Sequence, residues 1–178
     1  MRRVFISYFH KEDQSYKDEL VRACDKSAFS DYSVRDGDID DTNLEDERIR
    51  QIIRDEYLRD ASVTIVLLGK NTWRRKHVDW EISSTLRDTK LNSRGGLLGI
   101  MLPTHPEYYK NSLSKNTVPE RFYDNWANDY AVVIKWANLR CLDLKEHIDK
   151  AFNKKSYKTP NNSAPLRRKN SEPESFFY

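Results

Sequence analysis

Residues 62–68 read Ser62-Val63-Thr64-Ile65-Val66-Leu67-Leu68, and they form the clearest strand signal in the chain. The run is almost continuously apolar and rich in β-branched residues, and Gly69 ends it. A strand that is apolar on both faces is typical of the centre of a parallel sheet covered by helices on both sides. This stretch therefore predicts an α/β fold, and the other elements can be placed around it.

Shorter apolar runs predict the remaining strands, at residues 4–6, 97–102 and 131–134, with a weaker edge strand at 32–34. Apolar residues at helical spacing predict helices near residues 16–24, 49–57, 72–89 and 143–152. Strands that alternate with helices favour a parallel sheet with right-handed crossovers. We therefore expect a flavodoxin-like open parallel sheet of about five strands, flanked by helices, in the order 2-1-3-4-5.

Local signals refine this picture. Thr42 and Glu45 have the spacing of a capping box, which predicts a helix that begins directly after Thr42. The acidic stretch at residues 36–41 lacks the spacing of an EF-hand and is interpreted as a solvated loop near the mouth of the site. The aromatic region 104–128 carries no assignable pattern.

The composition predicts one domain and a tail. The chain has 178 residues and a net charge of +3. Residues 1–153 are expected to form the domain, whereas 154–178 are rich in Pro, Asn, Ser and basic residues and predict a disordered basic tail. No basic stripe marks the domain, which makes a nucleic-acid partner unlikely. The longest apolar run, 63–69, is too short to span a membrane.

The two cysteines, Cys24 and Cys141, match no metal or redox spacing. They are expected to be reduced and buried, which predicts a cytoplasmic protein. No other cluster with metal-ligand spacing is evident, so no metal is expected.

The topology itself predicts where a ligand would bind. In an open parallel sheet, ligands lie outside the carboxyl ends of the strands at the point where the strand order reverses, here between the first and third strands. The first strand leads into residues 7–10 and the third into residues 69–72. No glycine-rich dinucleotide fingerprint follows the first strand, and no aspartate ends the third, so a classical dinucleotide fold and a phosphoryl-accepting domain are disfavoured.

Position 81 is anomalous on the helix that follows the third strand. Val78, Ile82 and Leu86 mark its inward stripe, and residue 81 shares that side, yet it is a glutamate. In one interpretation the helix turns Glu81 outward to solvent or to a neighbouring basic residue. In the other, the carboxylate faces the crevice, where it could hold ribose hydroxyls or stabilise an oxocarbenium-like cation.

The residues that follow the first and third strands also allow both a structural and a ligand-binding interpretation. Phe9 and His10 fit either core and surface positions or a stacking wall for a planar ring. Ser7 could cap the following helix or line the pocket, and Asn71 is interpreted as a helix N-cap first and a ligand contact second.

Two stretches resemble a known family. "RRVFISYFHKED" at residues 2–13 is similar to the opening strand and loop of Toll/interleukin-receptor (TIR) domains, and "DASVTIVLLGKNTWRRKHVDWEI" at 60–82 is similar to their third strand and catalytic helix. The similarity is greatest to the bacterial TIR-like branch of Thoeris anti-phage defence. It covers about the first hundred residues.

The resemblance implies an enzyme that cleaves the nicotinamide–ribose bond of NAD and makes a cyclic ADP-ribose-type signal that activates a partner effector. NAD is then the substrate, and no cofactor is implied. Glu81 matches the catalytic glutamate, and the expected substrate-binding residues are Ser7, Phe9, His10, Asn71 and His77. His77 stands where many TIR domains carry an aromatic residue. The alternatives are a non-catalytic TIR scaffold that acts by self-association and a nucleoside deoxyribosyltransferase-like enzyme.

Overall fold

The structure is a computed structural model that describes residues 1–31 and 44–171. Its core is a five-stranded, all-parallel sheet in the order β2-β1-β3-β4-β5. The strands are β1 (Arg2–Ser7), β2 (Phe29–Asp31), β3 (Val63–Leu68), β4 (Gly96–Met101) and β5 (Val132–Lys135). The predicted fold class and strand order are confirmed.

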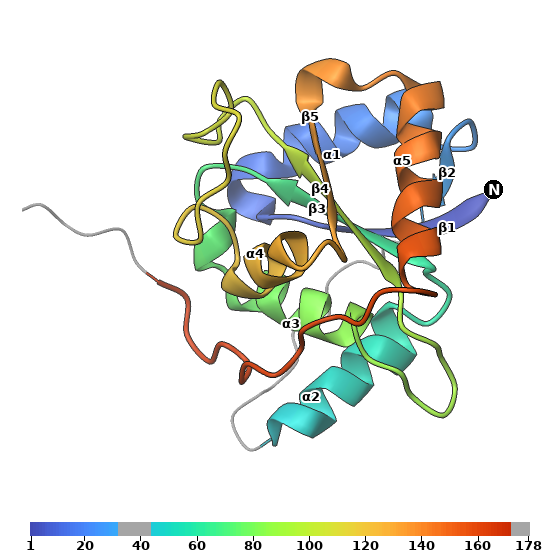
Figure 1. Ribbon diagram of the computed structural model, residues 1–178, viewed down its shortest axis with the longest axis vertical. Helices are drawn as coiled ribbons and strands as arrows, with labels where there is room; N and C mark the ends of the chain where they lie inside the picture. Colours follow the sequence, from blue (N-terminus) through green and yellow to red (C-terminus); the bar gives the residue numbers. More distant parts are fainter. Residues whose placement is uncertain (32–43, 172–178) are drawn as a thin grey trace, which may run out of the picture.

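Helices cover both faces of the sheet (Figure 1). The helices are α1 (His10–Cys24), α2 (Asp46–Ile52), α3 (Lys76–Thr85), α4 (Glu120–Ala127) and α5 (Cys141–Lys154), with short turns η1 (Ile53–Tyr57), η2 (Thr72–Arg74) and η3 (Trp136–Asn138). Helices α1 and α5 bury their apolar residues against one face, and α2, α3 and α4 pack on the other. Every residue of β3 is buried, as its double-sided apolar pattern predicts.

Several predicted boundaries are wrong. The edge strand lies at Phe29–Asp31 instead of 32–34, which falls outside the described residues. Helix α2 begins at Asp46 with Glu45 in the N-cap position, so the capping box built on Thr42 is wrong, and Thr42 itself lies outside the described residues with the acidic stretch 36–41. The helix predicted over 72–89 is divided into η2 and a shorter α3.

The unassigned region 104–128 is organised by buried polar groups. The Glu107 carboxylate accepts hydrogen bonds from the backbone N–H of Ser114 (2.8 Å) and from the hydroxyl of Thr117 (2.7 Å). Burial raises the pKa of Glu107, but these bonds together with one from the Ser114 hydroxyl outweigh it, so the pKa is lowered. Nδ1 of the buried His105 accepts the N–H of Glu107 (3.1 Å), and burial lowers the pKa of His105. The part of the region before residue 118 is thus a loop fixed by side-chain hydrogen bonds, whereas its second part forms helix α4, which the sequence reasoning did not predict.

The tail also differs from its prediction. Residues 159–171, here called the C-terminal strap, lie in extended form against α3 and α4 (Figure 1). Leu166 is buried in the cluster that contains Trp80, and Arg167 bonds to α3. The expectation of a disordered tail is therefore wrong for this segment, because side chains of the domain satisfy its backbone groups; residues 172–178 lie outside the described residues.

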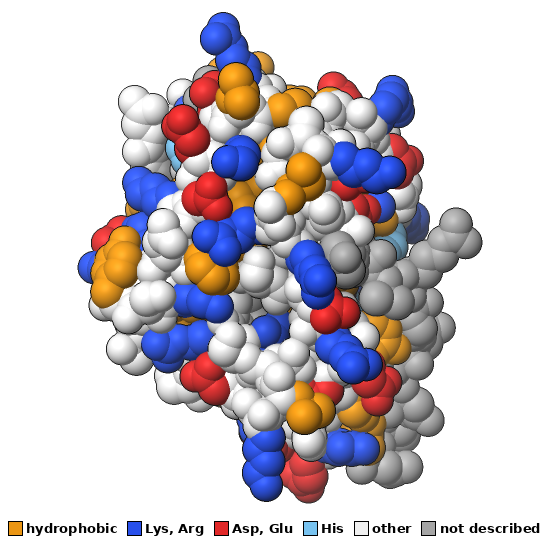
Figure 2. Space-filling view, turned by 90° about the vertical axis from the view of Figure 1, so that its right-hand side faces the viewer, with side chains coloured by type: hydrophobic (Ala, Val, Ile, Leu, Met, Phe, Trp, Pro, Cys, Tyr) orange, Lys and Arg blue, Asp and Glu red, His pale blue; other side chains and the backbone are white. Residues whose placement is uncertain are grey.

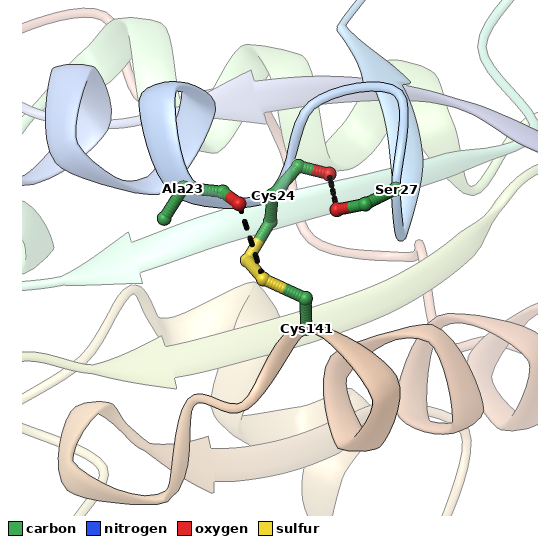
Figure 3. The surroundings of a disulfide bond; sticks show 4 residues. All are labelled: Ala23, Cys24, Ser27 and Cys141. Atoms are coloured by element: carbon green, nitrogen blue, oxygen red, sulfur yellow. Dashed lines mark hydrogen bonds between the residues drawn. A yellow bond between two sulfur atoms is a disulfide. The ribbon is translucent and has the colours of Figure 1, made fainter.

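Cys24 and Cys141 form a disulfide that joins the end of α1 to the start of α5 (Figure 3). The expectation of two reduced thiols is wrong. Spacing could not reveal the pair, because 117 positions separate the two residues. The argument from reduced cysteines to a cytoplasmic location therefore loses its basis.

Within the described residues, no helix has the length and apolar character needed to cross a membrane. On the face shown in Figure 2, the described Lys and Arg side chains are interspersed with Asp and Glu. That face therefore presents mixed charge.

Candidate functional site

Glu81 lies on α3, on the side of the helix that faces the end of β1. Its carboxylate oxygen Oε2 accepts a short hydrogen bond from the hydroxyl of Ser7, the last residue of β1. Ser7 is 1% exposed, and Glu81 is partly buried. The outward-pointing alternative is therefore excluded, and Ser7 and Glu81 meet at the carboxyl end of the first strand, where the strand order reverses.

A second polar pair holds the same helix one turn further along. The hydroxyl of Thr85 donates to the backbone carbonyl of Glu81 (2.8 Å) and lies 2.6 Å from the hydroxyl of Thr64 on β3. Both threonines are buried. Serine and threonine on the strands thus pair with Glu81 and Thr85 on the helix, which fixes the rotation and depth of α3 against the sheet.

Phe9, in the N-cap position of α1, and His10, the first residue of that helix, do not form one wall. The guanidinium of Arg75 lies over the Phe9 ring, 4.4 Å from its centroid. His10 is exposed, and its ring stacks on Tyr8 at a centroid distance of 4.1 Å. The structure therefore associates Phe9 with Arg75, a residue that the sequence reasoning did not select.

The other two expected substrate-binding residues, Asn71 and His77, contact groups other than Glu81 and Ser7 in the bonds described here. The side chain of Asn71 donates to the Glu12 carboxylate at 2.9 and 3.0 Å and makes no capping bond to η2. Asn71 occupies the predicted N-cap position, at the start of η2, but its side chain does not supply the capping bond. His77 is exposed on the first turn of α3, with its ring edge against Trp80 at 5.1 Å.

Asp13 is a buried acid that the sequence reasoning missed. It lies on α1 beside the end of β3 and is 1% exposed. Burial, reinforced by the neighbouring charge of Glu12, raises the pKa of Asp13 to about 6, against the effect of a hydrogen bond from Thr72. A Cβ atom on Gly69 would lie 2.5 Å from the Asp13 carboxylate, so only glycine leaves room for the acid.

The hydrophobic pattern could have revealed Asp13. Positions 13, 16, 20 and 24 share one side of a helix, and the last three carry Tyr, Leu and Cys. An acid on that stripe is the same kind of anomaly as Glu81.

Two pockets of the described surface lie elsewhere. One, of about 550 Å³, is bounded by Met101, Trp126 and Lys135 near the ends of β4 and β5. The other, of about 370 Å³, lies between Trp73 and Lys115. Neither is lined by Glu81, so the candidate site is located by the contact between Glu81 and Ser7 and not by these hollows. Within the described ranges, no three His, Cys, Asp or Glu side chains gather closely enough to hold a metal ion.

Comparison with known proteins identifies the family. The model of the family described as "Thoeris protein ThsB, TIR-like domain" matches residues 5–107, more than half of the chain. The chain belongs to this family. The match covers the end of β1 and all of β3 and α3, so Ser7 and Glu81 lie within the TIR-like domain.

A solved structure described as the activated Roq1 resistosome directly recognising the pathogen effector XopQ (TIR domains) is also similar. It is 14% identical, with 86% of this chain and 84% of that chain covered and a TM-score of 0.40. No curated protein matches the chain. Family membership associates this TIR-like domain with the Thoeris defence system.

Proposed function

We propose that this TIR-like protein cleaves the nicotinamide–ribose bond of NAD and makes a cyclic ADP-ribose-type signal that activates a partner effector in anti-phage defence. The observation that carries the proposal is the Glu81 carboxylate, which accepts a hydrogen bond from Ser7 at the carboxyl end of β1. Family membership supports the same proposal, because the match includes the end of this strand and the helix that carries Glu81.

In this proposal Glu81 stabilises positive charge. As the bond to nicotinamide lengthens, the ribose acquires oxocarbenium character, and a fixed carboxylate lowers the energy of that cation. The bond from Ser7 holds one carboxylate oxygen, and the threonine pair fixes the backbone of the helix. A carboxylate held before the reaction needs little reorganisation during it.

The leaving group requires no strong acid, because the nicotinamide of NAD is already cationic and departs as a neutral molecule. Attack by water would give ADP-ribose. Attack by a hydroxyl or ring nitrogen of the same molecule would give a cyclic product, and exclusion of water from the site favours that route.

Arg75 has a role in the same proposal. Its guanidinium lies over Phe9, close to the end of β1, and the NAD diphosphate needs a positive partner. Phe9 and Arg75 then act together, the ring against the nicotinamide and the guanidinium on phosphate. His10, Asn71 and His77 remain candidate contacts at the rim.

The test compares the wild-type chain with Glu81→Gln in cells that also carry the partner effector. After phage infection, nicotinamide, NAD and cyclic products are measured by mass spectrometry, with equal protein levels confirmed by immunoblotting. Glu81→Gln should reduce nicotinamide release by about 100-fold or more and abolish protection. Full protection by Glu81→Gln would refute the proposal and favour the scaffold that acts by self-association.

A further inference from the structure

The C-terminal strap, residues 159–171, has no helix or strand of its own, so its backbone groups need partners elsewhere. They find them on the domain. The Asn125 side chain bonds both the N–H and the C=O of Asn161, each at 2.8 Å. Asp46 accepts the N–H of Leu166 (3.0 Å), and Trp80 donates to the carbonyl of Arg167 (2.7 Å). The strap is therefore part of the folded domain.

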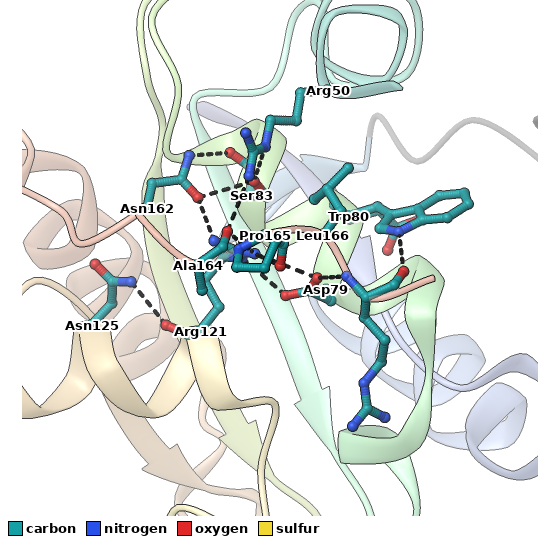
Figure 4. Close-up of polar contacts among 12 residues, drawn as sticks. Arg50, Asp79, Trp80, Ser83, Arg121, Asn125, Asn162, Ala164, Pro165 and Leu166 are labelled. Carbon is teal, nitrogen blue, oxygen red and sulfur yellow. Dashed lines mark hydrogen bonds and ion pairs between the residues drawn. The ribbon is translucent and has the colours of Figure 1, made fainter. Parts of the chain in front are cut away.

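The strap contacts one side of α3 along most of its length (Figure 4). The contacted positions are 76, 79, 80 and 83, which helical spacing places on one face. Glu81 lies on the opposite side of the helix, toward Ser7 and β1. The sheet and the strap thus hold α3 between them.

Near the end of α3 the contact is made by one amide. The side chain of Asn162 accepts a hydrogen bond from the Ser83 hydroxyl and donates one to the Ser83 carbonyl, both at 2.9 Å. The same amide oxygen accepts a bond from the guanidinium of Arg121 at 2.9 Å. Asn162 therefore links α3 to α4.

Arg121 is a buried cation, 2% exposed, that pairs with Asp79 on α3 at 2.9 Å. Its remaining donors bond the carbonyls of Ala164 (2.9 Å) and Pro165 (3.0 Å) in the strap. A buried cation is tolerated only when its donors are satisfied. The ion pair that ties α4 to the catalytic helix thus depends on the strap.

At its other end the strap caps the helix. Arg75, in the N-cap position of α3, makes no side-chain capping bond. The amide oxygen of Asn170 accepts the N–H of Lys76 at 2.9 Å, and the N–H of Ser171 bonds the carbonyl of Arg74 at 3.0 Å. A residue 94 positions away in the chain therefore satisfies one of the free donors at the start of the helix.

From these contacts we infer that the strap is a positioning element of the proposed NAD-cleaving site. Asn162 and Asn170 fix the position of α3 along its helix axis and thereby the distance of the Glu81 carboxylate from the reacting ribose. The inference rests on the proposed function. Asn162 and Asn170 act through the helix and need not touch NAD.

The experiment measures kcat and KM for nicotinamide release in Asn162→Ala and Asn170→Ala, under the conditions in which the wild-type chain cleaves NAD. A displacement of a catalytic group by about 1 Å lowers the rate by about 100-fold, so kcat should fall by about 10- to 100-fold while KM changes little. Asn170→Asp retains the acceptor for Lys76 and should restore kcat. Lys169→Ala, at an exposed strap position, should have the wild-type rate.

Hydrogen exchange supplies a second readout that needs no activity. Amides of α3 should exchange faster in Asn170→Ala, and slow again in Asn170→Asp, while those of β3 stay protected. Wild-type kcat in both alanine variants, or unchanged exchange in α3, would overturn the inference. A wild-type chain whose NAD cleavage does not depend on Glu81 would instead overturn the proposed function, which separates the two failures.

Discussion

The disulfide between Cys24 and Cys141 allows the most quantitative prediction. It joins α1 to α5 across a sequence separation of 117 residues, so it encloses most of the chain. Cys141→Ser removes the cross-link with a small change in volume at a partly exposed position. The variant should fold to the same structure and be less stable.

The magnitude follows from the length of the closed loop. In the chain-entropy treatment, a cross-link that closes a loop of about 118 residues removes about 16 cal/mol/K from the unfolded chain, or about 5 kcal/mol at 25 °C. Measured effects are usually smaller, since the unfolded chain is already compact, so we expect a loss of about 2–5 kcal/mol. For a chain of this size, each kcal/mol corresponds to about 2–4 °C in Tm.

The assay is urea unfolding followed by tryptophan fluorescence, with and without a reducing agent. The reducing agent should destabilise the wild-type chain by about as much as the substitution does, and it should leave Cys141→Ser unchanged. Thiol titration of the wild-type chain in denaturant without reductant should find no free thiol. Two free thiols there, or equal stability of the wild-type and Cys141→Ser chains, would contradict the reasoning.

Two further predictions concern the buried acid Asp13 and the packing of β4 against α5. Asp13 has a pKa of about 6 in the folded state, above its unfolded value, so between about pH 4 and 6 the folded state binds a proton that the unfolded state has lost. The free energy of unfolding therefore falls as the pH rises through that range. Asp13→Asn should remove this dependence and raise the free energy of unfolding at pH 7 by up to about 3 kcal/mol, which urea titration at pH 4 and 7 measures. An unchanged pH dependence in the variant would show that Asp13 is not the group responsible. A Cβ on Gly96 would lie 2.4 Å from the backbone oxygen of Ala151 in α5, so Gly96→Ala should lower the free energy of unfolding by about 3 kcal/mol. A Cβ on Gly95 would lie 3.2 Å from its nearest atom, so Gly95→Ala should lower it by about 1 kcal/mol in the same assay. Equal costs for the two alanines would refute this reading of the contact between β4 and α5.

The sheet was predictable because its central strands are buried on both faces. Burial on both sides favours apolar residues along the whole strand, and residues 63–68 and 97–101 follow that pattern with Thr64 as the one polar exception. The edge strand β2 has only three residues, and one alone is fully buried, so its pattern is too weak to fix its position. The start of α3 could not be predicted from its neighbours in the sequence either, because Asn170, 94 positions away, accepts the N–H of Lys76.

The site was predictable where a residue broke a pattern. Glu81 violates the apolar stripe of its helix, and the structure shows its carboxylate bonded to Ser7. Asp13 violates the stripe of α1 in the same way and could have been found by the same argument. Arg75 could not, because an arginine at the start of a helix breaks no rule until the ring of Phe9 is known to lie under it.

The strap shows why composition misled. A segment rich in Pro, Asn and Ser buries little apolar surface of its own, and in isolation it would not repay the entropy of ordering. Here the domain provides the partners: a buried arginine, an aspartate and a tryptophan that would otherwise lack some of their hydrogen bonds. The strap is thus ordered by its contacts with α3 and α4. The amino acids around residue 165 do not by themselves indicate that order.

Helix α3 is held by polar contacts on two sides, from the sheet and from the strap, and the carboxylate of Glu81 makes both useful. An ionised carboxylate at the edge of the core costs stability unless donors compensate it, and the sheet side offers the hydroxyl of Ser7. A helix packed by apolar contacts alone could shift to relieve such a charge, since those contacts have no direction. The directional bonds of Asn162 and Asn170 on the far face oppose that shift. The strap therefore adds to the hydroxyl contacts of the sheet a second restraint on the place of Glu81, and a preorganised carboxylate requires such restraint.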